Sequence, residues 1–262
     1  MECDDRRQVD VGPESDIHLD VFHAISDDSK VRRPVIVYFF RKPFNIRKHY
    51  PVCAYFAARG IVAISAGPMP EHGTTPEVPI TAGKSVIRYV RAHADELGID
   101  PKAVIAAGGS GDAHIAASCA VIETFDNPDE DASVSSKPDA LVLSSSCLDF
   151  TNLPKKVERL GMNRAHSVSP VHHIKPGSPP ALVMHGENDE TMDVDQVYRY
   201  KQGMDHAGNR CELRTYPCGH GLGSYRDFRF NETLEEADRF LVSLGYLTGE
   251  SRVSSFEFPD NS

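Results

Sequence analysis

The hydrophobic and polar positions along this chain change their period several times. Short, continuous apolar runs predict strands that are buried on both faces of a sheet. Such runs occupy residues 34–40, 60–65, 103–107, 140–144 and 180–185. Residues 16–24 instead alternate between apolar and polar side chains, which predicts a strand with a single buried face.

Helical patterns lie between and after these runs. In residues 80–97 apolar side chains recur at helical spacing, as at Val86, Ile87 and Val90, and the pattern ends before Gly98. Further helical patterns occupy residues 114–121, 194–207 and 232–244. Strands that alternate with helices predict the α/β class, with a mostly parallel sheet, helices on both faces and functional groups at the carboxyl ends of the strands.

The length of 262 residues fits one α/β domain with a large core, so we predict a single domain over residues 1–262. Residues 126–139 are polar and rich in turn formers, which predicts a surface loop. Residues 148–178 have weak periodicity and several prolines. This composition predicts a small cap excursion over the functional site.

The net charge of −10 and the absence of a lysine or arginine stripe argue against nucleic acid or an anionic membrane as a partner. No apolar stretch approaches the ~20 residues of a membrane span, and the first residues lack the apolar core of a secretory signal. We therefore expect a soluble, cytoplasmic protein that acts on a small molecule. A signal removed from the chain as given, and the oligomeric state, stay open.

Six cysteines are scattered along the chain without the spacing of metal ligands or of a disulfide scaffold. We expect mostly buried, reduced thiols, and a bond between Cys211 and Cys218 stays open. The adjacent His172 and His173 lack a carboxylate or thiolate at ligand spacing. The sequence therefore predicts neither a metal nor a cofactor.

Candidate chemistry is concentrated in residues 104–118. An apolar run there enters Gly108-Gly-Ser-Gly111 and leaves as an alanine-rich helical pattern. A serine at such a strand-to-helix turn has an exposed Oγ, and the amide of Gly111 faces the same space. A flexible linker has the same glycine and serine composition, but the ordered flanks favour a packed turn. We predict that Ser110 is a nucleophile.

The groups that activate a serine follow downstream. Its hydroxyl needs a histidine to take the proton and a carboxylate to orient that histidine. Asp189 follows the run at 180–185, and His220 lies between two glycines further on. The alternative acids are Asp193, Glu187 and Asp149. We interpret His114 and His185 as packing residues.

These residues resemble those of the α/β-hydrolase esterases, in the branch of acetyl-xylan-esterase-type and hormone-sensitive-lipase-like enzymes. The resemblance covers roughly residues 16–246. It is carried by Gly108-Gly-Ser-Gly-Asp-Ala-His-Ile-Ala116, residues 82–93, residues 182–189 and Gly219-His-Gly221. It implies the α/β-hydrolase fold, with Ser110, Asp189 and His220 as the catalytic triad in the family's order.

Two positions depart from the pattern of that family. Residues 41–45 stand where it carries His-Gly-Gly-Gly, whose amides help to bind the oxyanion. The candidate oxyanion and substrate-binding residues here are Gly109, Gly111, Asp112, Arg41, Lys42 and Phe44.

The second departure is Asp112, where the pattern Gly-x-Ser-x-Gly ends in glycine. A carboxylate in the first turn of a helix is favourable. Asp112 also has the charge to raise the pKa of a nearby histidine, or it faces solvent. The sequence does not choose between these roles.

Two functions of different classes follow from these observations. The first is a serine hydrolase that cleaves small carboxylic esters, with acetyl esters of carbohydrates as one candidate, through an acyl-enzyme. The second is a catalytically impaired member of the same fold that binds a ligand or partner without turnover, because the glycine-rich loop is missing. A peptidase of the same fold is less favoured, because no additional substrate-restricting domain is evident.

Overall fold

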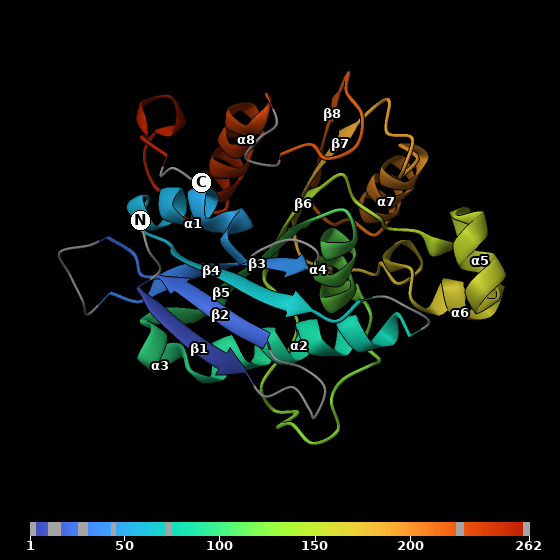
Figure 1. The fold of residues 1–262 in the computed structure, drawn as a ribbon, viewed down its shortest axis with the longest axis horizontal. Helices are drawn as coiled ribbons and strands as arrows, with labels where there is room; N and C mark the ends of the chain where they lie inside the picture. The colour runs from blue at the N-terminus through green and yellow to red at the C-terminus, as the bar shows by residue number, and fades with distance from the viewer. Residues whose placement is uncertain are drawn as a thin grey trace.

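The structure is a computed structural model that describes residues 4–9, 17–25, 31–42, 46–71, 75–223 and 228–258. Within these residues eight strands form one sheet in the order β1-β2-β4-β3-β5-β6-β7-β8 (Figure 1). The strands are β1 Asp5–Val9, β2 Ile17–Phe22, β3 Arg33–Arg41, β4 Val62–Met69, β5 Ile99–Gly109, β6 Ala140–Ser144, β7 Ala181–Gly186 and β8 Cys211–Tyr216.

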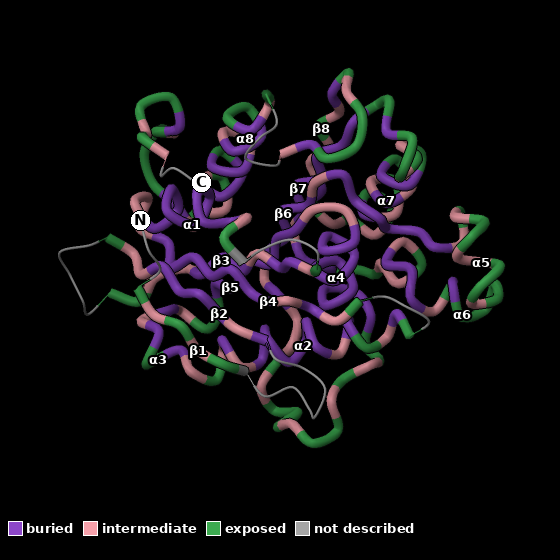
Figure 2. The backbone as a smooth tube through the Cα atoms, viewed as in Figure 1, coloured by how far each residue is buried: buried purple, intermediate pink, exposed green. Residues whose placement is uncertain are grey.

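The sheet is parallel from β4 through β8, and β1 and β2 add an antiparallel edge beside β4. This confirms the predicted mostly parallel sheet. The continuous apolar runs are buried because helices cover both faces (Figure 2). The carboxyl ends of the parallel strands therefore meet at one edge, where loops of distant sequence come together.

Eight helices are present in the described part of the chain, with short 3₁₀ turns between some of them. They are α1 Tyr50–Ala58, α2 Glu77–Ala92, α3 Ala94–Leu97, α4 Gly111–Val121, α5 Pro154–Leu160, α6 Met162–Ser167, α7 Asp195–His206 and α8 Phe230–Ser243. Helices α2, α4 and α7 pack on one face of the sheet, and α1 and α8 pack on the other (Figure 1). Two apolar cores result, one on each face.

A buried ion pair joins the two helices on the second face. Asp238 on α8 accepts hydrogen bonds from Arg59 Nε (2.7 Å), just after α1, and from Tyr55 Oη on α1 (2.6 Å). The side chains of Arg59 and Asp238 are 5% and 0% exposed. Because the carboxylate is fully paired, this cluster fixes α8 beside α1 without leaving a buried charge unsatisfied.

Local differences from the sequence-based expectations have physical reasons. Helix α1 was not predicted, because eight of its nine residues are buried and it therefore shows no polar face. The helix expected over residues 80–97 starts at Glu77 and is divided at His93, whose backbone leaves helical geometry (φ −99°, ψ 27°). The five described cysteines are reduced, including Cys211 and Cys218.

Candidate active site

A strained serine stands where β5 passes into α4. Ser110 has φ 58° and ψ −122°, outside the regions that side-chain-bearing residues favour. Such a conformation costs about 1–3 kcal/mol. Its N–H donates to the carbonyl of Ser144 (2.9 Å), and its own carbonyl accepts from His114 N–H (3.2 Å). Gly108 is required below the turn, because a Cβ there would lie 2.6 Å from the carbonyl carbon of Asp112.

His220 connects this serine to a buried carboxylate. Its Nδ1 lies 2.8 Å from Asp189 Oδ2, and its Nε2 lies 3.0 Å from Ser110 Oγ. An ionised carboxylate only accepts hydrogen bonds, so the proton of the neutral ring belongs on Nδ1, and Nε2 accepts from the serine. The side chain of Asp189 is 0% exposed and that of His220 is 29% exposed.

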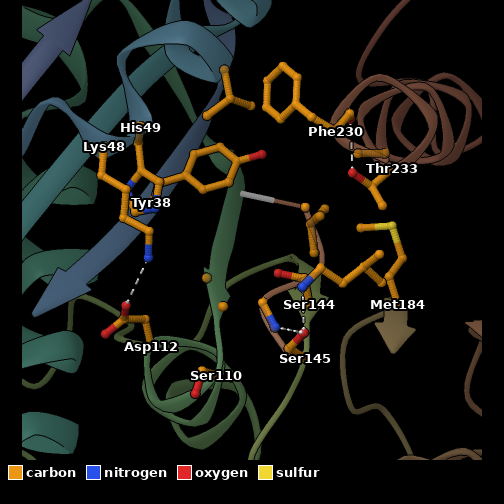
Figure 3. Close-up of a pocket in the computed structure, with 18 of the residues that line it drawn as sticks. Tyr38, Lys48, His49, Ser110, Asp112, Ser144, Ser145, Met184, Phe230 and Thr233 are labelled. Carbon is orange, nitrogen blue, oxygen red and sulfur yellow. Dashed lines mark hydrogen bonds and ion pairs between the residues drawn. The ribbon is translucent and has the colours of Figure 1, made fainter. Parts of the chain in front are cut away.

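Neighbouring groups hold the acid and the histidine loop in place. Asp189 Oδ1 accepts the N–H groups of Thr191 and Met192, both at 2.9 Å. Ser145 Oγ accepts the N–H groups of Gly221 (3.2 Å) and Leu222 (3.0 Å), directly after His220. The serine run that ends β6 thus fixes the loop that carries the histidine (Figure 3). The sequence reasoning did not single out this run.

The alternative acids lie elsewhere. Glu187 and Asp193 are exposed. Glu187 accepts a hydrogen bond from Thr215 Oγ1, and Asp193 accepts one from the Asp195 N–H, both at 2.9 Å. Asp149 is buried and lies 3.3 Å from Arg199. Of the four carboxylates considered, the structure brings Asp189 to His220.

Two other histidines near this edge are held by hydrogen bonds to backbone groups. His114 is buried, and its Nε2 donates to the carbonyl of Val168 at 2.7 Å. His185 accepts from the Ser146 N–H (3.1 Å) and donates to the Met192 carbonyl (2.8 Å), which fixes a neutral ring beside Asp189. Burial lowers the pKa of both rings.

A pocket of about 320 Å³ opens beside Ser110 and extends between the sheet, α1 and α8 (Figure 3). Its wall away from the serine is mostly apolar. The apolar lining residues are Tyr38, Val52, Val142, Met184, Leu222, Phe230, Leu234 and Ala237. None of the described lining residues belongs to 148–178, where α5, α6 and two 3₁₀ turns lie; a cap role for that segment stays a prediction.

Charged side chains lie at the serine end of the pocket. Asp112 accepts a hydrogen bond from Arg41 Nε at 2.6 Å, and Lys48 Nζ lies 4.0 Å from its other oxygen. Asp112 is 1% exposed, so it does not face solvent. Burial raises the pKa of its carboxyl against the opposing effect of the two cations, and burial also lowers the pKa of Lys48.

The remaining predicted site residues have different surroundings. Gly109 lines the pocket, and Gly111 begins α4 with its N–H at the helix N-terminus. Lys42 is exposed and is not among the lining residues, whereas Lys48, which the sequence reasoning missed, is. Phe44 lies outside the described residues.

Neither a metal centre nor a membrane span is apparent in the part of the chain that the structure describes. No three histidine, cysteine, aspartate or glutamate side chains of those residues converge as a metal-binding group. No helix there has both the length and the apolar character needed to cross a bilayer.

Solved structures of an esterase share this architecture. Esterase 2 of Thermogutta terrifontis, in its apo form, superposes with a TM-score of 0.85 at 32% sequence identity, over 94% of this chain and 96% of that one. Its butyrate-bound form gives a TM-score of 0.85 at 31% identity. The chain is an α/β-hydrolase-fold esterase of the carboxylic ester hydrolase class. It belongs to the BD-FAE family, whose family model matches residues 74–204.

Curated relatives agree with this class over a part of their length. The probable carboxylic ester hydrolase LipM of Mycobacterium tuberculosis is 26% identical over 167 residues, which are 56% of this chain and 38% of that protein. Endo-1,4-beta-xylanase B of Butyrivibrio fibrisolvens is 25% identical over 163 residues, 58% of this chain and 26% of that protein. The matches thus span about two fifths and about a quarter of these longer proteins.

Proposed function

We propose that this esterase hydrolyses small carboxylic esters through an acyl-enzyme formed on Ser110. The observation that carries the proposal is the hydrogen-bonded chain from Ser110 Oγ through His220 to Asp189, at 3.0 and 2.8 Å. His220 Nε2 takes the serine proton as Oγ bonds to the ester carbonyl carbon, and Asp189 stabilises the imidazolium that forms. The same proton then passes to the leaving alcohol, and a water molecule repeats the sequence to release the acid.

The carbonyl oxygen gains negative charge when Ser110 attacks. The N–H of Gly111 is placed to stabilise it, because this amide begins α4 and has no partner within the helix. A helix N-terminus also carries a partial positive charge. The strained Ser110 conformation supports this role, because it directs Oγ and the following amide to the same side of the turn.

The apolar pocket supports a short aliphatic acyl group. Its size of about 320 Å³ and its apolar wall suit an acyl chain of a few carbons, with the alcohol at the open mouth. The Thermogutta esterase has been solved with propionate or butyrate bound. We extend the proposal to acetyl esters of carbohydrates, since a curated relative is a xylanase by name and the acetyl group is the smallest member of this acyl series.

The first test compares hydrolysis of an aryl acetate by the purified protein and its Ser110→Ala variant over about pH 6–9, a range that brackets a histidine base. We expect turnover in the unmodified protein and none above background in the variant. Equal turnover in both would refute the assignment of Ser110. The alternative function, a catalytically impaired protein that binds a ligand or partner, predicts turnover in neither protein.

A second measurement does not depend on the true ester. One solved structure of the Thermogutta esterase is phosphorylated by paraoxon. We expect the same reagent to form a phosphoryl adduct on Ser110, located by peptide mass spectrometry, and no adduct in Ser110→Ala. A protein that neither hydrolyses the aryl acetate nor forms this adduct would favour the binding alternative.

A further inference from the structure

The guanidinium of Arg41 lies directly against the residue that follows the nucleophile. A Cβ built on Gly111 would lie 2.6 Å from Arg41 Cζ and closer still to Nη2. Only a residue without a side chain therefore admits the guanidinium at this place. The N–H of Gly111 is the proposed oxyanion donor, so the cation lies beside the position where negative charge develops.

A buried carboxylate fixes the guanidinium there. Asp112 accepts from Arg41 Nε at 2.6 Å, and the side chains of Arg41 and Asp112 are 22% and 2% exposed. Asp112 belongs to the first turn of α4, so the acceptor is part of a rigid element. Because the hydrogen bond uses Nε, Nη1 and Nη2 are the atoms that lie over Gly111. Lys48, 4.0 Å from Asp112, adds a second cation at this end of the pocket (Figure 3).

We propose that Arg41 is a second oxyanion-stabilising group and that Asp112 is the residue that positions it. The inference rests on the proposed function of Ser110. When Oγ bonds to the carbonyl carbon, the π pair moves to the carbonyl oxygen, and the guanidinium N–H groups donate to this oxyanion beside the Gly111 amide. Hydrogen bonds from a guanidinium to an anion are about twice as strong as neutral ones. The guanidinium thus replaces the glycine-rich loop.

Gly111→Ala is the most discriminating variant. It keeps the backbone N–H of residue 111 and leaves Arg41 and Asp112 unchanged, but its methyl group displaces the guanidinium. Alanine is also the better helix former, so the variant is expected to fold. Removal of one oxyanion donor lowers kcat by ~10²–10³-fold in other enzymes, and we expect a loss on the order of 10² with little change in KM.

Gly111→Ala is measured in two backgrounds, to distinguish displacement of the guanidinium from obstruction of the substrate. The first background is the unmodified protein. The second carries Arg41→Ala and Asp112→Gly, which removes both charges and leaves no buried carboxylate unpaired. In that background kcat is expected to be low already, and Gly111→Ala is expected to lower it no further. A similar additional loss in both backgrounds would show that the methyl group obstructs the ester, and the proposal would be wrong.

The positioning role of Asp112 has its own readout. Asp112→Asn is expected to lower kcat at unchanged KM, with Asp112→Glu recovering part of the loss, and to have no further effect when Arg41 is alanine. Arg164→Gln is the matched control, because it breaks an ion pair between Arg164 and Glu77 (2.6 Å). Neither of these two residues lines the pocket. Thermal unfolding of each variant checks that it is folded.

Two further results would overturn the inference and leave the proposed function intact. One is Ser110-dependent turnover at the unmodified rate in Gly111→Ala. The other is a rise in KM at constant kcat, which would make Arg41 a group that binds the ground-state ester. Turnover that does not require Ser110 would instead refute the proposed function itself.

Discussion

The apolar pocket predicts a measurable preference for acyl length. Lengthening an acyl group from acetyl to butyryl places two more CH₂ groups against the apolar wall. Each is worth about 0.8 kcal/mol when buried, so the pair contributes about 1.6 kcal/mol. At 1.36 kcal/mol per factor of ten, kcat/KM for a butyrate ester is expected to exceed that for the acetate by roughly 15-fold.

Ala237→Leu tests whether the acyl chain enters this pocket. Ala237 on α8 is 2% exposed and lines the wall, so a leucine there occupies space that the longer chain needs. Each methylene that a pocket fails to accept costs about 1–3 kcal/mol. We expect the variant to lose the butyrate preference, through a fall of at least about tenfold in kcat/KM for the butyrate, while the acetate changes by less than about threefold.

The assay is the ratio of kcat/KM for the nitrophenyl butyrate and acetate, measured in parallel. Asn231→Leu is the control, because residue 231 is exposed on the same helix and the same leucine side chain is then introduced outside the pocket. It is expected to keep the unmodified ratio. An unchanged ratio in Ala237→Leu would refute the argument, because the acyl chain would then lie elsewhere.

Two further predictions concern the triad and the helix that carries Ser110. Asp189→Asn is expected to lower kcat by ~10⁴-fold, whereas Asp193→Asn, at an exposed turn, keeps the unmodified rate; equal losses would contradict the assignment of the acid. Burial lowers the pKa of His114 to about 4. As the pH falls from 6.5, this histidine therefore becomes protonated in the unfolded chain before it does so in the folded protein. The free energy of unfolding should therefore fall by about 3 kcal/mol between pH 6.5 and pH 4 because of this ring. Denaturant titration at several pH values measures this change, and His114→Gln should make it smaller. Parallel curves for the two proteins would refute the role of this ring.

The parts of the fold with a strong periodic signal were predictable. The run at 140–144 coincides with β6, and the predicted strand-turn-helix around Ser110 is present as β5 and α4. Helix α1 was not predictable in this way, because burial on all sides removes the polar face that marks a helix. The polar strand β1 was not predicted either, because it is a strand through its pairing with β2 and not through its own hydrophobicity.

The candidate triad was predictable because Ser110 and Asp189 each follow an apolar run and His220 lies between two glycines. The pocket was not, because its wall combines β3, α1, β6 and α8, and no sequence rule states that Tyr38 and Ala237 share a cavity. These residues are brought together by tertiary packing on one face of the sheet. The Ser144-Ser-Ser146 run at the end of β6 stands in the sequence, and two of its members line the pocket, but no sequence pattern assigned it to a cavity.

The two departures from the family pattern become a single feature in three dimensions. Arg41 and Asp112 are 71 positions apart, and in the sequence they appear as two unrelated departures. Arg41 stands where the family has a glycine-rich loop, and Asp112 stands two positions after the nucleophile, where the family has glycine. Strand β3 pairs with β5, so the end of β3 reaches the first turn of α4 and the two side chains meet at 2.6 Å. A buried carboxylate without a cation would be costly, and a cation without that carboxylate would not be held over Gly111. Each departure thus supplies the physical reason for the other, which is why a chain that lacks the glycine-rich loop still has cationic donors beside its nucleophile.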